Sequence, residues 1–526
     1  NGKGIYAQNS DITLTGNYII ETPEKGIGIF ASGSTNVNGT LEYKYNGSTT
    51  GTGMGIVYDS AVTNNANVKL TNATNTTGGM IGVYATSGTF TNNGDITGSS
   101  SALEFGIVSD GVNVVNAGNI TLGNATTQKK ANVGIYAKAN NTITNNGTVT
   151  VGDNAIGVYG YNVNNTSDIK ARDNGVAIYT QGTGTTVNLN SGSALTIGNN
   201  QAVGVYAVGS NQQINTNTGS GMTIGNNSFG IVNVGSGNTV TSNTANSVSL
   251  RRDAVYIYQN DNTGTVNSST PLISTGDRNY GLYGNGTMNN AGVIDFSAGN
   301  GNVGMYATTG GTAINNGGII KVGTSNTSAK EFGVGMATGY YNETTDTVSN
   351  QGTVINRGTI EVTNPNTMGM YAVGAGSKAV NYGNINLSGN ETVGMYIDRG
   401  AVGENWGTIQ TTAGGLKSVK GVYVANGGYI KNYGTINIAA SDPKSAGIWT
   451  DNADHAEEHA TGVNPVTGGN QTGTSTPAMK VATASDMKDM GGRTIKVPPR
   501  VTSPIVTDVN GSPIPIYQVD TDVATP

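Results

Sequence analysis

Residues 133–151 read Val133-Gly-Ile-Tyr-Ala137, Thr142-Ile-Thr144 and Thr148-Val-Thr-Val151, with Asn-containing turns between the three runs. This stretch decides the fold. Runs of three to five apolar and β-branched residues are typical of short strands, and Gly and Asn between them are typical of turns. Strands this short cannot bury a face on their own, so we expect each such unit to stack on a copy of itself.

Copies of this unit do recur along the chain. The triplet Gly-Ile-Tyr, with variants at each position, appears 18 times at intervals of about 26 residues. Its copies begin at Gly4, Gly28, Gly55, Gly82, Gly106, Gly134, Gly157, Ala177, Gly204, Gly230, Tyr256, Gly281, Gly304, Gly335, Gly369, Gly394, Gly421 and Gly447. A second motif, Asn-x-Gly-x-Ile/Val, follows in phase and begins at Asn92, Asn116, Asn145, Asn290, Asn315, Asn356, Asn381, Asn405 and Asn432.

The two phased motifs predict an all-β fold, a right-handed parallel β-helix of about 18 coils with about 26 residues per coil. At about 4.8 Å per coil this would be a rod of roughly 85 Å. Gly before the aromatic residue permits a backbone conformation or a close approach that a Cβ would block. Tyr residues at one angular position would stack from coil to coil as a scaffold, with a sugar-binding stripe as the functional alternative. Asn amides at the turns would hydrogen-bond between coils.

The composition agrees with a repeat array and excludes several other classes. The chain of 526 residues contains 81 Gly, no Cys and only 11% charged residues. Gly and Asn are poor helix formers, which argues against a helical bundle or a Rossmann-type enzyme. Without Cys there are no disulfides and no thiolate metal sites. A net charge of −6 disfavours nucleic acid and anionic lipid as partners, and no apolar run is long enough for membrane insertion as a helix.

The sequence changes character after about Asp451. The last 75 residues contain 8 of the 12 Pro, both His and only 7 Gly. We therefore predict a β-helix over 1–451, a Thr/Gly/Asn-rich linker over 452–490, and a Pro-punctuated extended or cap segment over 491–526. The repeat is already in register at Asn1, so we expect the chain to be part of a longer protein.

An insertion in one repeat gives the best candidate for a contact surface. The interval from Ala337 to Tyr371 contains about ten extra residues, 338–349. Insertions in solenoids form loops, often on the binding face, and Tyr is common in recognition sites. The candidate binding residues are Tyr340, Tyr341, Glu343 and Asp346. A passive surface loop is the alternative.

Catalytic motifs are scarce. His455-Ala-Glu-Glu-His459 matches the H-x-x-E-H pattern, which requires a helix, a third ligand and a cleft. Residues 453–460 could form two helical turns, so His455 and His459 are weak candidates for divalent metal binding, with a solvated polar turn as the alternative. Polysaccharide lyases and glycosidases on β-helices use paired acids on one face, whereas the acids here are scattered. No enzyme activity and no cofactor are expected.

The phased Gly-Ile-Tyr and Asn-x-Gly-x-Ile motifs resemble the passenger domains of bacterial type V autotransporters, most closely the large fusobacterial outer-membrane adhesins. The resemblance covers about residues 1–451. It implies display on the outer membrane and adhesion to a host-cell receptor, a glycan or another bacterium, by a rod that we expect to be monomeric. A passive stalk is the first alternative function, and a polysaccharide-degrading enzyme is the second.

Overall fold

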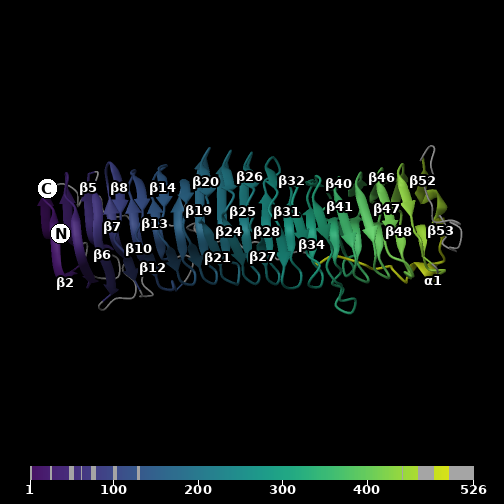
Figure 1. The fold of residues 1–526 in the computed structure, drawn as a ribbon, viewed down its shortest axis with the longest axis horizontal. Coiled ribbons are helices and arrows are strands. Elements are labelled where there is room, and N and C mark those ends of the chain that lie inside the picture. The colour runs from purple at the N-terminus through teal and green to yellow at the C-terminus, as the bar shows by residue number, and fades with distance from the viewer. Residues whose placement is uncertain are drawn as a thin grey trace. The chain divides into compact units, whose positions relative to one another are not determined.

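The structure is a computed structural model that describes residues 3–23, 26–46, 52–60, 62–72, 79–98, 103–126, 131–440, 442–459 and 479–496. The chain divides between Val232 and Asn233 into two compact units, unit 1 and unit 2, which are described separately. Each is a parallel β-solenoid in which strands of successive coils lie side by side (Figure 1). The prediction of an all-β parallel β-helix with about 26 residues per coil is confirmed.

In unit 1, each copy of the Gly-Ile-Tyr motif lies on a strand that pairs in parallel with the motif strands of the adjacent coils. These motif strands are β1 (Lys3–Gln8), β3 (Ile27–Ser32), β5 (Thr52–Asp59), β7 (Gly79–Ala85), β10 (Glu104–Ser109), β13 (Val133–Ala137), β16 (Ile156–Gly160), β19 (Val176–Thr183) and β22 (Val203–Ser210). The next motif strand, β25 (Phe229–Ser236), contains the boundary between the units.

The rest of each coil in unit 1 forms a second sheet. The first three coils use one long strand each, β2 (Ile12–Thr22), β4 (Val37–Tyr45) and β6 (Thr63–Asn72). Later coils have two short strands, namely β8 (Thr89–Asn92), β9 (Ile96–Gly98), β11 (Asn113–Asn116), β12 (Ile120–Leu122), β14 (Thr142–Asn145), β15 (Val149–Val151), β17 (Asn162–Asn165), β18 (Ile169–Ala171), β20 (Thr186–Leu189), β21 (Ala194–Ile197), β23 (Gln213–Thr216) and β24 (Gly221–Ile224).

Unit 2 repeats this plan. Its motif strands are β28 (Val255–Asn260), β31 (Tyr280–Gly284), β34 (Val303–Ala307), β37 (Val334–Thr338), β42 (Met368–Val373), β45 (Val393–Asp398), β48 (Lys420–Ala425) and β51 (Ala446–Thr450). The shorter strands are β26 (Thr239–Ser242), β27 (Val248–Leu250), β29 (Thr265–Ser268), β30 (Leu272–Ser274), β32 (Thr287–Asn290), β33 (Val293–Asp295), β35 (Thr312–Asn315), β36 (Ile319–Lys321), β40 (Thr353–Asn356), β41 (Thr359–Val362), β43 (Lys378–Asn381), β44 (Asn384–Leu387), β46 (Val402–Asn405), β47 (Thr408–Thr411), β49 (Tyr429–Asn432) and β50 (Thr435–Asn437).

Strand pairing extends past Asp451, where the repeat motif of the sequence ends. β52 (Ala456–Glu458) pairs with β49, and β53 (Met479–Val481) pairs with β51, both in parallel. The helical elements among the described residues are two single turns, the 3-10 helix η2 (Ala453–His455) and α1 (Ala484–Met487). Residues 497–526 of the predicted extended or cap segment lie outside the described residues.

The motif glycines are required by close approach between coils. A Cβ on Gly106 would lie 2.5 Å from the carbonyl oxygen of Gly134, and a Cβ on Gly369 would lie 2.6 Å from that of Gly394. The sequence predicted either a special backbone conformation or a close approach at these glycines. The close approach is the reason at Gly106 and Gly369, since neither residue has a positive φ. Two coils have Ala177 or Tyr256 at the Gly position of the motif. The steric requirement for Gly therefore differs from one coil to another.

The first Asn of each Asn-x-Gly turn is buried and belongs to a column of amides. In unit 1 the Nδ2 of Asn92 donates to Asn116 Oδ1 (2.8 Å) and also to Gly94 O (2.8 Å), within its own turn. The same column continues in unit 1 through Asn64, Asn92, Asn116, Asn145 and Asn165. Unit 2 has its own column, formed by Asn290, Asn315, Asn356, Asn381, Asn405 and Asn432. The predicted coil-to-coil amide bonding is confirmed.

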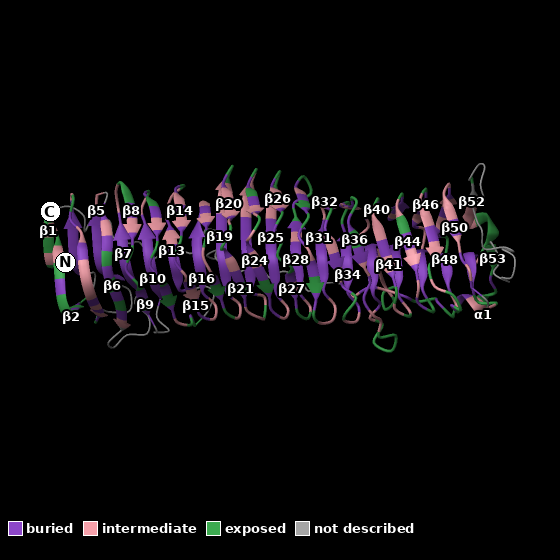
Figure 2. Cartoon of the chain, viewed as in Figure 1, coloured by how far each residue is buried: buried purple, intermediate pink, exposed green. Residues whose placement is uncertain are grey.

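The tyrosines of the motif are mostly buried, as Figure 2 shows for the motif strands. Their rings stack within each unit, for example Tyr159 on Tyr179 at 4.9 Å and Tyr396 on Tyr423 at 4.6 Å between centroids. This supports the scaffold interpretation. The alternative, a sugar-binding stripe on this series, is wrong for these residues because their ring faces are occupied by neighbours in the stack.

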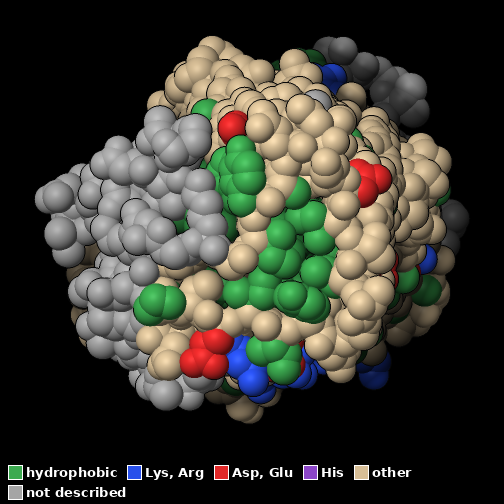
Figure 3. Space-filling model, turned by 90° about the vertical axis from the view of Figure 1, so that its left-hand side faces the viewer, with side chains coloured by type: hydrophobic (Ala, Val, Ile, Leu, Met, Phe, Trp, Pro, Cys, Tyr) green, Lys and Arg blue, Asp and Glu red, His purple; other side chains and the backbone are tan. Residues whose placement is uncertain are grey.

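The end of unit 1 that carries β1 and β2 exposes hydrophobic side chains (Figure 3). Tyr6, Tyr18 and Ile19 are 51%, 43% and 52% exposed. In the described residues, β1 pairs with β3 and β2 pairs with β4, so these strands have a neighbouring coil on one side.

One copy of the second motif differs from the others. The motif that begins at Asn315 ends at Ile319, yet Ile319 is 37% exposed and Ile320 is fully buried. An additional glycine, Gly317 at φ +85°, lengthens this turn by one residue and shifts the inward-facing position.

The close approach at the motif glycines gives a stability prediction. We expect Gly369→Ala to lower the free energy of unfolding by about 2 kcal/mol, because the new Cβ would overlap a backbone carbonyl and Ile385 Cγ2 (2.8 Å). Gly414 is a matched control, since a Cβ there meets nothing within 4 Å. Urea denaturation followed by circular dichroism measures both variants. Equal stability of the two variants would contradict the steric explanation.

Candidate functional site

The sequence-predicted contact residues lie together on a small hairpin in unit 2. β38 (Tyr340–Asn342) and β39 (Thr347–Ser349) pair in antiparallel register, with Tyr341 opposite Val348. The hairpin is the teal-green loop below β41 in Figure 1, where it projects away from the coils of unit 2. The turn is formed by residues 343–346, in which Asp346 has a φ of +50°. The insertion is therefore an ordered β-hairpin.

Side-chain contacts hold three of the four predicted residues. Tyr341 donates a hydrogen bond from its hydroxyl to Asp346 Oδ1 (2.8 Å), and the Arg399 guanidinium carbon lies 3.5 Å from the centroid of the Tyr341 ring. Glu343 forms an ion pair with Lys330. Tyr340 is half-buried. The hairpin thus presents an aromatic ring, a guanidinium and a carboxylate in a fixed arrangement at the surface of unit 2.

A second surface feature of unit 2 was missed in the sequence. It is a column of stacked rings made by Tyr382, Trp406, Tyr433 and His459, which we call the aromatic column. The centroid distances are 6.3 Å for Tyr382–Trp406, 3.9 Å for Trp406–Tyr433 and 5.0 Å for Tyr433–His459, with interplanar angles of 22°, 10° and 14°. Arg357 covers the first ring, at 4.6 Å from its centroid.

The position of the aromatic column follows from the amide column. Tyr382, Trp406 and Tyr433 are the middle residues of the turns Asn381-Tyr-Gly383, Asn405-Trp-Gly407 and Asn432-Tyr-Gly434. Each buried Asn points inward, so the residue after it points outward and repeats once per coil. Tyr382 and Trp406 are 44% and 47% exposed as a result. Aromatic residues at this position in three successive repeats were the signal that would have revealed the column.

The segment 479–496 crosses unit 2 against the direction in which the coils advance, and we call it the strap. It begins at β53 next to β51, and its Arg493 reaches coils that come more than 100 residues earlier in the chain. Arg493 is 4% exposed and donates to the carbonyl oxygens of Glu391 (2.8 Å) and Thr367 (3.5 Å). Burial lowers the pKa of this guanidinium to about 10. Backbone carbonyls therefore hold the strap in place.

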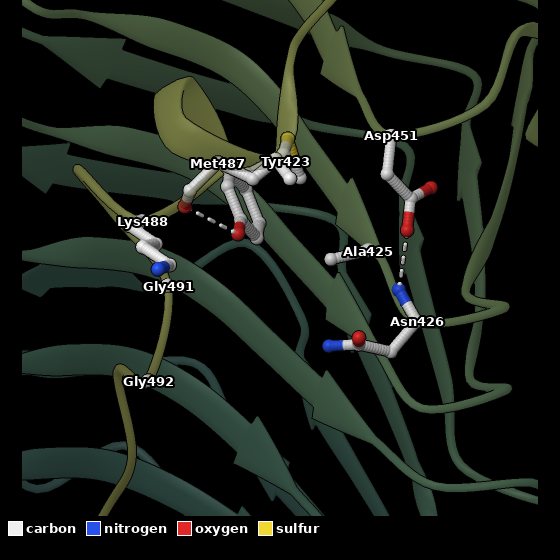
Figure 4. Close-up of a pocket in the computed structure, with 9 residues that line it drawn as sticks. Tyr423, Ala425, Asn426, Asp451, Met487, Lys488, Gly491 and Gly492 are labelled. Atoms are coloured by element: carbon white, nitrogen blue, oxygen red, sulfur yellow. Dashed lines mark hydrogen bonds between the residues drawn. The ribbon is translucent and has the colours of Figure 1, made fainter.

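A pocket of about 420 Å³ lies between the strap and the coils of β48 and β51 (Figure 4). Tyr423 donates its hydroxyl proton to Met487 O (3.1 Å), and Asp451 Oδ2 accepts from the backbone N–H of Asn426 (2.8 Å). Lys488 also lines this pocket. The lining contains a single carboxylate, whereas glycoside hydrolysis requires two. This pocket can hold a polar ligand, and its residues do not form an acid–base pair.

The strap also encloses a buried lysine. Lys420 is fully buried, with its Nζ 4.5 Å from the centroid of Trp449, and Lys480 of the strap lies 4.4 Å from the same ring. Burial, together with the charge of Arg493, lowers the pKa of Lys420 to about 8.

The helix that the H-x-x-E-H pattern requires does not form around the two histidines. Residues 453–455 form a single 3-10 turn, and 456–458 then pair as a strand with Ile430–Asn432 of β49. His455 Nδ1 contacts Asp451 Oδ1 at 3.1 Å, whereas His459 stacks on Tyr433 and contacts Glu457. The two rings thus have different partners. In the described part of the chain, no group of three or more His, Cys, Asp or Glu is arranged to hold a metal ion.

A search of the described residues for membrane spans finds no helix long and apolar enough to cross a bilayer.

Comparison with known families gives one match. Residues 296–406 match the family described as the BigA third pectate lyase-like domain. This stretch is about a fifth of the chain, and it contains the hairpin, Arg357, Tyr382 and Trp406. The match and the solenoid fold together fit a passenger domain of the surface-adhesin type. The comparison with curated proteins finds no match.

The buried lysine predicts a dependence of stability on pH. Between about pH 8 and about pH 10 the unfolded chain binds a proton at Lys420 that the folded chain does not, so the free energy of unfolding should rise with pH in this window. We expect Lys420→Met to remove this slope and to stabilise unit 2 at pH 7 by about 2 kcal/mol, because a neutral side chain avoids the desolvation of the ammonium.

Urea midpoints measured at several pH values between 7 and 10 test this prediction. The control is Lys417→Met, since Lys417 is exposed and its replacement should leave the slope unchanged. Identical pH profiles for wild type and Lys420→Met would show that Lys420 is solvated as an ammonium throughout.

Proposed function

We propose that this chain is part of the extracellular passenger region of a bacterial adhesin. In this proposal it is displayed on the outer membrane and binds a receptor or glycan on a host cell or on another bacterium. The observation that carries the proposal is the ordered hairpin of unit 2, whose aromatic and charged groups are presented at the surface of a regular scaffold. The match to the BigA third pectate lyase-like domain supports it, because the matched residues include the hairpin.

Neighbouring side chains preorganise the hairpin for binding. Tyr341 is held by Asp346 and Arg399 before any partner arrives, so little side-chain entropy is lost on binding. Many copies on one cell would then multiply a modest affinity per site. The passive-stalk alternative predicts instead that the hairpin and its neighbours make no contact with the target.

A polysaccharide-degrading enzyme is the second candidate, and the name of the matched domain is the observation that favours it. The pocket beneath the strap offers no carboxylate pair for hydrolysis, whereas a pocket of about 520 Å³ in unit 1 is lined by Asp153 and Asp173. Incubation of the chain with polygalacturonate, followed by chromatography of released oligosaccharides, separates the two functions. We expect no release; sustained release would support the enzyme.

Binding of the soluble chain to epithelial cells, measured by flow cytometry, tests the adhesin proposal. We expect saturable binding that Tyr341→Ala weakens about tenfold or more, because a preorganised aromatic anchor is lost. Tyr18→Ala, at an exposed tyrosine of unit 1, is the matched control and should leave binding within about twofold.

Absence of binding by the folded wild-type chain, to epithelial cells and to partner bacteria alike, would exclude the adhesin function for this segment and leave the stalk. Equal losses in Tyr341→Ala and Tyr18→Ala would exclude the hairpin as the contact site.

A further inference from the structure

The aromatic column is an exposed aromatic feature of unit 2, with Tyr382 and Trp406 open to solvent. Its rings are held from within by the buried amides of Asn381, Asn405 and Asn432, so they do not need to pack against each other to fix the coils. Trp406 is the more exposed of the two tryptophans of the chain, at 47% against 1% for Trp449.

The spacing of the rings leaves part of a ring face open. Paired strands are about 4.8 Å apart. The centroids of Tyr382 and Trp406 are 6.3 Å apart at an interplanar angle of 22°, so these two rings are displaced sideways relative to each other. Arg357 covers one face of Tyr382 and Tyr433 covers one face of Trp406. The open surface is therefore the part of the two facing rings that the displacement leaves uncovered, together with the ring edges. Electron-rich ring faces attract the weakly positive C–H groups of an apolar or amphipathic ligand.

One flank of the aromatic column presents neutral hydrogen-bonding groups. Two rows of polar residues run across successive strands. The first consists of Asn384, Thr408 and Thr435, and the second consists of Asn386, Gln410 and Asn437. All are exposed or half-exposed, and Gln410 Nε2 already donates to Asn386 Oδ1 (3.1 Å). These rows can donate to and accept from hydroxyl groups without requiring a charge on the ligand.

The other flank is charged but balanced. Lys378 and Glu404 form an ion pair at 2.8 Å, and Glu404 also accepts from the indole N–H of Trp406 (3.3 Å). Lys431 and Glu457 occupy equivalent places in the next coils, opposite each other in the strand register. Two lysines thus face two glutamates. With Arg357 over the Tyr382 ring, the aromatic column and this flank have a single excess positive charge. One excess charge gives no strong preference for a polyanion, and the neutral rows of the opposite flank suit an uncharged ligand.

We propose that the aromatic column and its flanks form a binding strip for a neutral glycan. Sugar rings present C–H groups on their faces, which contact the open parts of Tyr382 and Trp406, and hydroxyl groups at their rims, which the Thr, Asn and Gln rows bind. Because the strip repeats from coil to coil, it fits a linear chain of several sugar residues. This inference rests on the proposed adhesin function and names the chemical class of its ligand.

Titration of the full chain with neutral oligosaccharides tests the strip. The probes are cellohexaose, chitohexaose and a galactose-terminated tetrasaccharide, with polygalacturonate as the anionic comparison and a proline decapeptide as the peptide comparison. We expect binding of at least one neutral probe, with a change in tryptophan emission that comes from the exposed Trp406, since Trp449 is buried. Trp406→Leu should remove the emission change and weaken binding at least tenfold, and Trp406→Phe should restore most of the affinity.

Circular dichroism and urea midpoints of the variants distinguish lost binding from lost structure, and Tyr18→Leu serves as the exposed aromatic control in unit 1. Failure of all neutral probes to bind the folded chain would overturn the proposal, as would preferential binding of polygalacturonate or of the proline peptide. Cell binding that persists undiminished in Trp406→Leu and in the presence of the neutral probes would overturn the glycan strip while leaving the adhesin function in place.

Discussion

The buried asparagine column is the interaction on which the rest of the structure depends. Each amide spans two coils: Asn381 Nδ2, for example, donates to Asn405 Oδ1 of the next coil (2.8 Å) and to Gly383 O of its own turn (3.2 Å). A buried amide must find such partners, and only one registration of successive coils supplies them. The column therefore fixes both the turn and the coil-to-coil register in the coils that carry it, from Asn64 to Asn165 in unit 1 and from Asn290 to Asn432 in unit 2.

Because the register is fixed, residues at the same position of successive coils line up in rows along the solenoid. Where the outward residue of the turn is Tyr382, Trp406 or Tyr433, the row becomes a column of exposed rings. The Tyr residues of the Gly-Ile-Tyr strands form a mostly buried stack instead, and the strap contacts this stack at Tyr423. The hairpin at Tyr341 is a different device, an insertion that leaves the coil and returns to it without disturbing the pairing of β37 with β42. Regular rows and one local insertion together give unit 2 a defined contact surface.

The sequence predicted the parallel solenoid because every repeat has the same pattern of short strands and turns. It predicted the hairpin region because an insertion interrupts a regular spacing. Tyr382, Trp406 and Tyr433 occupy the variable position of three successive Asn-x-Gly motifs, so the sequence contains the signal for the aromatic column. The motif alone does not show that this position faces outward or that the rings stack. Local spacing allowed two helical turns at 453–460, but it does not include the neighbouring coil, whose strand β49 pairs with residues 456–458. The strap contacts made by Arg493 span more than 100 residues, and no local pattern encodes them.

Hydrogen exchange in Asn381→Ala is the most direct test of the central claim. The backbone N–H groups of Tyr382 and Gly383 donate to Asn356 O (2.7 and 3.0 Å), and those of Trp406 and Gly407 donate to Asn381 O at the same distances. Loss of the amide should speed exchange at these four positions about tenfold or more, with a loss of about 2 kcal/mol in stability. The exposed neighbour Asn384, replaced by Ala, should leave all four unchanged. Equal protection in both variants would contradict the account, because the turns would then hold their register without the buried amides.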